Sequence, residues 1–118
     1  MTATLIKNAR LIDPSADTVT EGGVLIGDGR ITAVLSLSEA EDAISRVPQE
    51  NVIDAGGACL APGIVDLGVK VCEPGERHKE SFKTAGQAAA AGGVTTMVTR
   101  PDTDPAIDNP EVLEFIRR

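Results

Sequence analysis

The fold is decided by residues 61–99, which read APGIVDLGVKVCEPGERHKESFKTAGQAAAAGGVTTMVT. Apolar side chains alternate with polar or small ones over residues 64–71, and this pattern predicts a strand. A helix is predicted over residues 81–91, because Ser81 can cap its first turn and two glycines follow its last residue. Residues 94–99 predict a second strand. A strand, a helix and another strand in this order are typical of a parallel α/β sheet.

The residues before this stretch predict a small β domain. Gly27, Asp28 and Gly29 have the sequence of a tight hairpin turn between two short strands. Strands are expected over residues 4–9, 11–13, 23–26, 30–34, 52–54 and 58–61, with one short helix over residues 38–44 and another that begins at Glu111. We place the domain boundary near residue 58. Residues 1–58 then form the β part and residues 59–118 the α/β part.

The composition excludes several classes of protein. The chain has 118 residues and a formal net charge of −7, so it is expected to repel nucleic acid and anionic membrane surfaces. Its apolar fraction of 42% is that of a soluble globular protein, and no apolar stretch predicts a signal peptide or a membrane span. The two cysteines, Cys59 and Cys72, are too few for a disulfide framework. We therefore expect reduced thiols and a cytoplasmic location.

The strand over residues 64–71 has two unlike faces. One face is apolar and is expected to pack under helices; it carries Val65, Leu67, Val69 and Val71. The other face is partly polar, although parallel strands are usually apolar on both faces; it carries Ile64, Asp66, Gly68, Lys70 and Cys72. Because α/β folds place their sites at the carboxyl ends of strands, the polar residues are candidates to line a pocket. The alternatives are a buried Asp66–Lys70 pair and a strand close to solvent.

Several sequence blocks resemble the dihydroorotases of the amidohydrolase superfamily. In chain order the blocks are LIDP at 11–14, DGRI at 28–31, APGIVD at 61–66, EPG at 73–75, HKE at 78–80, AAAAGGVTT at 88–96 and PDTDP at 101–105. The resemblance implies the N-terminal part of a metal-dependent-hydrolase TIM barrel, an α/β fold, preceded by part of a small β-sandwich domain. A closed barrel needs about 250 residues, so the barrel portion here is expected to be incomplete.

The positions that the resemblance assigns to the metal are altered. Dihydroorotases that resemble this sequence carry a His-x-His pair directly after the aspartate that corresponds to Asp66, and the pair binds zinc. The two positions are Gly68 and Lys70 here. Glycine has no ligand atom, and a lysine ammonium repels a metal ion. His78 is the only histidine and provides one ligand at best, so we expect no metal ligands and no zinc.

The positions that the resemblance assigns to the substrate are altered as well. The family arginine that binds the substrate carboxylate corresponds to Cys72, and the family asparagine that also binds it corresponds to Asp102. Each lost hydrogen bond to a charged group costs about 1.5–3 kcal/mol of binding energy, before any repulsion from Asp102. We therefore expect no catalytic and no substrate-binding residues, in a fold that is otherwise kept.

One contact is predicted between the altered positions. Lys70 and Asp102 follow the ends of neighbouring parallel strands, which lie about 4.8 Å apart in a sheet. We expect their side chains to form an ion pair, with Arg100 as a competing partner of Asp102. The lysine ammonium would then carry a positive charge where the family carries zinc.

The sequence leaves two functions open, beside a third possibility, a soluble α/β fragment with no surviving role. The first is a catalytically inactive, dihydroorotase-like protein of pyrimidine biosynthesis that serves as a structural partner of aspartate transcarbamoylase, as the resemblance implies. The second is an active zinc-dependent cyclic amidohydrolase, of dihydroorotase, hydantoinase or allantoinase type, with ligands outside this chain. In both cases we expect an oligomer or a part of a longer polypeptide, because two parallel strands alone leave their edges uncovered.

Overall fold

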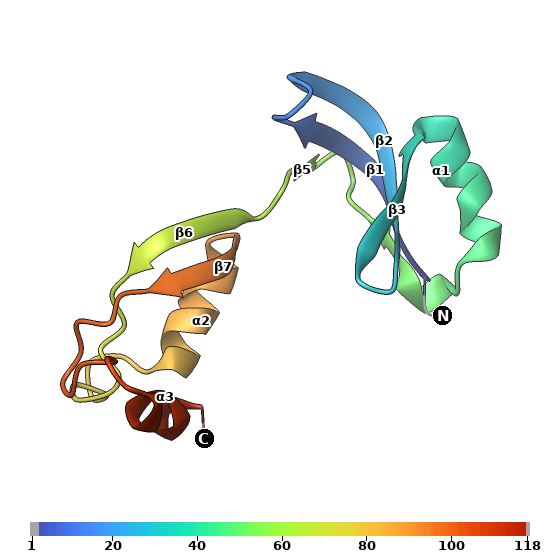
Figure 1. The fold of residues 1–118 in the computed structure, drawn as a ribbon. Helices are drawn as coiled ribbons and strands as arrows, with labels where there is room; N and C mark the ends of the chain where they lie inside the picture. The colour runs from blue at the N-terminus through green and yellow to red at the C-terminus, as the bar shows by residue number, and fades with distance from the viewer. Residues whose placement is uncertain (1–2, 118) are drawn as a thin grey trace. The chain divides into compact units, whose positions relative to one another are not determined.

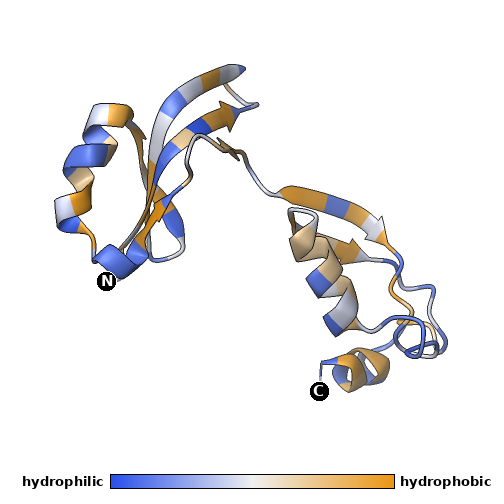
Figure 2. Cartoon of the chain, turned by 180° about the vertical axis from the view of Figure 1, so that it is seen from behind, coloured by the Kyte–Doolittle hydropathy of each residue, from blue (hydrophilic) through white to orange (hydrophobic). Residues whose placement is uncertain are grey.

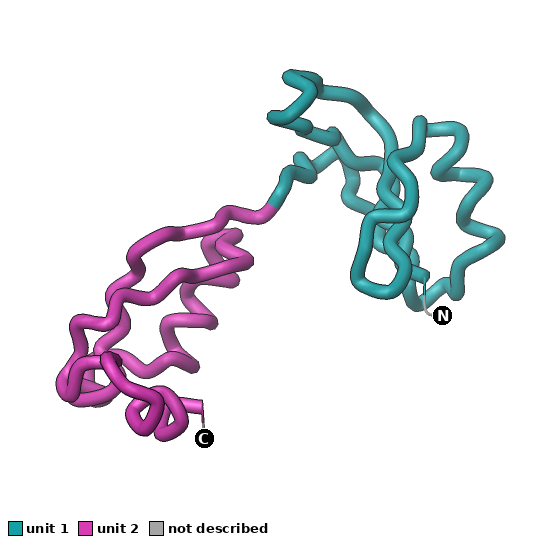
Figure 3. The backbone as a smooth tube through the Cα atoms, viewed as in Figure 1, with its two compact units in different colours: residues 1–62 teal, residues 63–118 magenta. Residues whose placement is uncertain are grey.

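The structure, a computed structural model, describes residues 3–117 of the chain. The chain divides into two compact units between Pro62 and Gly63 (Figure 3). The first unit therefore extends beyond the predicted boundary at residue 58. The reason is that β5 (Cys59–Leu60) pairs with β1 (Ala3–Asp13) and so belongs to the first sheet.

The first unit is a five-stranded sheet with one α-helix (Figure 1). β1 pairs with β2 antiparallel and with β4 and β5 parallel, and β2 pairs with β3 antiparallel. The elements not yet given are β2 (Thr18–Gly27), β3 (Arg30–Ser36), α1 (Leu37–Ala43) and β4 (Val52–Asp54). Short 3-10 helices occupy Ile44–Arg46 and Gln49–Asn51. The sheet therefore combines two parallel pairings with two antiparallel ones.

The core of the first unit is aliphatic, as expected from a chain with two phenylalanines and no other aromatic residue. Leu5 is fully buried and packs with residues of α1 and the following turn. A second cluster contains Ala9, Leu11 and Val24, which lie on paired strands. The hairpin turn is confirmed, because Asp28 and Gly29 have φ angles of 51° and 73°. Both φ angles are positive, and both residues lie between β2 and β3, as a tight turn between antiparallel strands requires.

Several strands are longer than predicted. β1 runs through Arg10 without a break, although residues 4–9 and 11–13 were expected as separate strands. The register shifts between Ile6 and Ala9, where Asn8 has a φ of 53°. The bulge lies at Lys7 and Asn8, whereas Arg10, where the break was expected, pairs regularly with Glu21, so the ladder continues through it.

The second unit contains a parallel pair of strands and two helices (Figure 1). Its elements are β6 (Ile64–Val69), α2 (Phe82–Ala91), β7 (Val94–Thr99) and α3 (Pro110–Ile116). The predicted cap of α2 is confirmed, because the Ser81 side chain accepts a hydrogen bond from the Thr84 amide. α3 begins with proline at its first turn, where no backbone donor is needed. The predicted strand, helix, strand and helix order is confirmed.

One face of the parallel pair is open to solvent. Val65 is 57% exposed, Leu67 76% and Val98 50%. The prediction that the whole apolar face of β6 packs under helices is therefore wrong for Val65 and Leu67, because α2 lies against β7. Figure 2 shows the apolar residues along β6 that this leaves uncovered. Among residues 3–117, no helix is long and apolar enough to cross a membrane.

Candidate functional site

The carboxyl end of β6 is shaped by a bulge at Gly68. Leu67 pairs with Val98 and Val69 pairs with Thr99, so Gly68 is an extra residue in the ladder. Its φ of 100° is readily adopted only by glycine. The strand consequently ends at Val69, short of the predicted end at residue 71. The regular alternation of side chains that the sequence predicts does not continue beyond Gly68, because a bulge re-aims the residues that follow it.

The predicted ion pair at the strand ends is confirmed. Lys70 Nζ lies 3.8 Å from Asp102 Oδ2, and Arg100 Nη2 donates a hydrogen bond of 2.7 Å to the same oxygen. The Arg100 amide also donates to the Val69 carbonyl oxygen at 2.9 Å, which ties the end of β7 to that of β6. All three side chains are exposed to solvent. The alternative of a buried Asp66–Lys70 pair is wrong, because Asp66 is exposed and Lys70 faces Asp102.

The loop after β6 is attached to the start of α2 by Glu73. One carboxylate oxygen of Glu73 accepts a hydrogen bond of 2.8 Å from the Phe82 amide, and the other lies 3.1 Å from Arg77 Nε. A negative charge at the first turn of a helix is favourable because the amide groups there are unpaired. Glu73 is largely buried, with 22% of its side chain exposed. Its two oxygens therefore hold the loop in place.

The same loop packs against the loop that follows β7. A Cβ atom added at Gly75 would collide with the Asp104 carbonyl, and the Asp104 amide donates to the Pro74 oxygen at 3.4 Å. Pro74 is buried beneath this contact. The contact between these loops was not predicted from the sequence, although the Glu-Pro-Gly block contained a signal for it. A glycine directly after proline marks a turn and permits close approach of another backbone.

The charges around the site are arranged in local pairs. Lys79 forms a hydrogen-bonded ion pair with Glu76, which holds the pKa of Glu76 below and that of Lys79 above their ordinary values. Lys70, which lies in the segment after β6, lowers the pKa of Glu76 further through its charge, to a smaller extent. His78 itself is exposed, as expected for a solvated loop histidine. In the loop after β6, Glu73 and Glu76 are thus paired with Arg77 and Lys79, and the loop offers no cluster of unpaired carboxylates to a cation.

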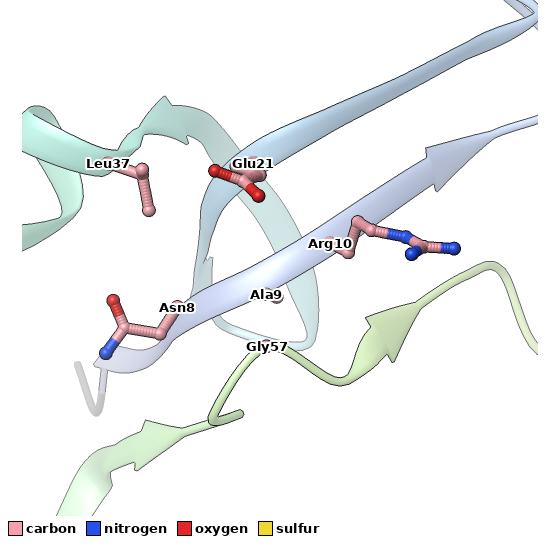
Figure 4. A pocket seen from close by; sticks show the side chains of 6 residues that line it. All are labelled: Asn8, Ala9, Arg10, Glu21, Leu37 and Gly57. Carbon is pink, nitrogen blue, oxygen red and sulfur yellow. The ribbon is translucent and has the colours of Figure 1, made fainter.

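A pocket in the first unit offers no convergent chemistry (Figure 4). It is lined by Asn8, Ala9, Arg10, Glu21, Leu37 and Gly57. The side chains of Asn8 and Arg10 are directed away from each other in Figure 4. Asn8 instead supports the bulge of β1, because its side chain donates to Asp54 at 2.9 Å and its carbonyl accepts from the Gly57 amide at 2.7 Å. Asn8 is therefore used by the fold.

The family follows from a match to the second unit and the residues before it. The family model described as "Dihydro-orotase-like" matches residues 57–118, which is more than half of the chain. The chain belongs to the dihydro-orotase-like family. The match includes every residue of the strand-end site described above, from Gly68 to Asp102.

Curated relatives extend the similarity over the first unit. The chain is 43% identical over 112 residues to a dihydroorotase of Streptococcus pyogenes serotype M1, covering 95% of this chain and 25% of the relative. It is 41% identical over 116 residues to a dihydroorotase of Chlorobaculum tepidum, covering 98% and 26%. The chain therefore spans about a quarter of the length of these relatives.

Solved structures of hydantoinases share the fold. The chain matches the L-hydantoinase (dihydropyrimidinase) of Arthrobacter aurescens with a TM-score of 0.76 and 30% identity, covering 98% of this chain and 24% of that one. It matches a D-hydantoinase with a TM-score of 0.70, 25% identity and the same coverage. The α/β fold that the sequence predicts is thus confirmed as that of the N-terminal segment of these amidohydrolases.

The residues present at the expected metal position do not fit a zinc ion. Gly68 has no ligand atom, and the Lys70 ammonium lies beside Asp102 as a cation. Zinc in proteins takes thiolate, imidazole or carboxylate ligands, three or more to an ion. Within the described part of the chain, no three such side chains are grouped closely enough to hold a metal. The carboxylate beside Lys70, that of Asp102, is already bound by Arg100.

Proposed function

We propose that the protein that contains this chain is a dihydroorotase-like, cytoplasmic protein of pyrimidine biosynthesis that has lost catalysis. The observation that carries the proposal is the cluster at the strand ends, where Lys70 and Asp102 form an ion pair beside Gly68. A hydrolytic metal centre needs an open, electron-rich ligand set that can lower the pKa of a bound water. A glycine and a protonated amine cannot provide one.

The substrate half of the site supports the same proposal. Cys72 stands where the resemblance places a carboxylate-binding arginine, and its backbone oxygen accepts from the Glu76 amide within the loop. Asp102 brings a negative charge to the position of a carboxylate-binding asparagine. An anionic substrate would lose the hydrogen bonds of the implied arginine and asparagine, and it would be repelled by the carboxylate of Asp102.

A structural role in complex with aspartate transcarbamoylase is the function that we propose in place of catalysis. The resemblance to inactive dihydroorotase relatives gives the partner. The aliphatic core of the first unit and the capped helices support it, because a protein that is kept only for assembly needs its fold and not its catalytic centre.

An active cyclic amidohydrolase is the second candidate. The observation in its favour is the identity of 41–43% to curated dihydroorotases, together with the match to hydantoinase structures. This candidate requires that ligands from outside residues 1–118 hold the metal without the two altered positions.

The experiment uses the full-length protein, purified without chelators, beside an active dihydroorotase as positive control. We expect no ring opening of dihydroorotate above background and co-purification with aspartate transcarbamoylase. Ring opening that depends on stoichiometric zinc would contradict the loss of catalysis. Absence of the transcarbamoylase from the purified complex, and failure of the two purified proteins to bind, would contradict the structural role.

A further inference from the structure

We propose that Lys70, Arg100 and Asp102 form a strand-end clamp, an internal ionic link that joins the loop after β6 to the loop after β7 without a metal ion. The inference rests on the proposed function, because it needs the altered positions to be free of metal. The inference adds a structural role to these residues. Their charges hold the two loops together, beyond the exclusion of a metal ion.

The geometry brings both loops to one oxygen atom. Lys70 comes from the segment after β6, whereas Arg100 and Asp102 come from the segment after β7. Asp102 Oδ2 accepts from Arg100 Nη2 at 2.7 Å and lies 3.8 Å from Lys70 Nζ. Because Arg100 fixes the carboxylate within its own loop, Lys70 is the member of the clamp that crosses from one loop to the other.

The side chain of Arg100 lies beside the bulge at Gly68. A Cβ atom added at Gly68 would meet Arg100 Cγ at 4.0 Å. Lys70 and Arg100 share the carboxylate of Asp102, so these three side chains together carry a net positive charge. Removal of Asp102 would leave Lys70 and Arg100 with no anion between them. The contributions of Lys70 and Asp102 to loop stability are therefore expected to be coupled.

The clamp acts on loops that are otherwise held by backbone contacts. The loop after β7 contains two internal amide contacts to the Pro101 carbonyl, from Thr103 at 2.9 Å and Ile107 at 3.0 Å. Its first residue is tied to the end of β6 by the 2.9 Å hydrogen bond from the Arg100 amide to the Val69 carbonyl, and the Asp104 amide contacts the Pro74 oxygen of the other loop at 3.4 Å. An ionic link at Lys70 adds to these backbone contacts, so its loss should increase opening of the loop rather than unfold the protein.

Hydrogen exchange of residues 100–109 in the full-length protein tests the clamp. We expect Lys70→Met to raise the exchange rate of these amides about twofold to fivefold, the range of a solvent-exposed ion pair. Asp102→Asn should have the same effect, and the double variant should exchange no faster than either. Lys70→Arg, which keeps the charge, should behave as wild type. Lys83→Met, which removes an exposed lysine of α2, is the matched control and should leave the rate unchanged.

The outcomes separate the clamp from the proposed function. Equal exchange in wild type and Lys70→Met, or additive effects in the double variant, would overturn the clamp and leave the loss of catalysis standing. Each measurement is repeated with EDTA. If EDTA accelerates exchange of these amides in the wild-type protein, a metal ion holds the loops, and both the clamp and the loss of catalysis are wrong.

Discussion

Gly75 is required by two features of its surroundings. Its φ of 104° lies in the region that favours glycine, and a Cβ atom would collide with the Asp104 carbonyl of the neighbouring loop. The first feature concerns the backbone of Gly75 alone, whereas the second concerns the packing of two loops. A substitution here therefore tests whether the loops are in contact.

Gly75→Ala is expected to destabilise the protein by about 2–3 kcal/mol, because it combines backbone strain with a backbone clash. Gly93→Ala is the matched control. Gly93 also has a positive φ, of 79°, but nothing lies within 4 Å of an added Cβ, so we expect about 1 kcal/mol from strain alone. Urea unfolding of the full-length protein measures both. Equal losses in the two variants would argue against the contact between the loops.

The hydrogen bonds of the Asp54 carboxylate predict that the stability of the first unit depends on pH. Its carboxylate accepts hydrogen bonds from the Gly56 amide and the Asn8 side chain, which lower its pKa from the ordinary value of 3.8; the Lys7 charge contributes less. Since the folded pKa is lowered, the stabilisation is present above the unfolded pKa and is lost as the pH falls through the folded value.

Asp54→Asn is therefore expected to flatten the acid limb of the stability curve below about pH 4. The melting temperature of the full-length protein, measured from neutral to acid pH, gives this slope. Asp17→Asn, at an exposed turn residue, serves as the control and should retain the wild-type slope. An acid limb that is as steep in Asp54→Asn as in wild type would contradict the assigned hydrogen bonds.

At the scale of elements, the sequence predicts those strands, caps and turns that are determined by residues close together in the chain. The strand over 94–99, the helix cap at Ser81 and the hairpin turn at Asp28 follow from side-chain pattern, capping and turn sequence, and all three are confirmed. The bulge at Gly68 was missed because Gly68 was placed in a regular alternation of side chains, although an isolated glycine in a strand pattern is a signal for a bulge. The contact at Gly75 was missed because it joins residues that are distant in sequence.

The cap of α2 gives a prediction for an element. Ser81 and Thr84 form a reciprocal pair, in which each side chain accepts a hydrogen bond from the backbone amide of the other, at 3.2 Å and 2.9 Å. Ser81→Ala is expected to destabilise the protein by about 1 kcal/mol, and Ser81→Asp, which retains an acceptor, by much less. Thermal unfolding of the full-length protein distinguishes them. Equal melting temperatures of Ser81→Ala and wild type would show that the cap does not stabilise α2.

At the scale of the whole molecule, the parallel pair is incomplete as a folding unit. β6 and β7 each have an unpaired edge, and Val65, Leu67 and Val98 are at least half exposed on one face. Unpaired parallel edges and exposed aliphatic side chains favour association with other chains. The sequence predicted the open edges from the small number of barrel strands, but not which residues remain exposed.

Residues 1–118 produced alone are therefore expected to self-associate, and Leu67→Arg should reduce the association by placing a charge on the open face. Size-exclusion chromatography with light scattering gives the mass. Phe115→Arg is the control, because Phe115 is similarly exposed, at 70%, but lies on α3 away from the strands. A monomeric wild-type fragment, or equal effects of both substitutions, would contradict the assignment of the β6–β7 face.

The proposed loss of catalysis depends above all on the Lys70 ammonium group, which stands at a position where the resemblance to dihydroorotases implies a zinc ligand. Anomalous diffraction at the zinc absorption edge, from crystals of the full-length protein grown with added zinc, tests it most directly. We predict no anomalous peak beside Gly68 and Lys70, and a lysine side chain that remains paired with Asp102. A peak at that position, at the distance of about 2.0–2.3 Å from protein ligands that zinc requires, would contradict it.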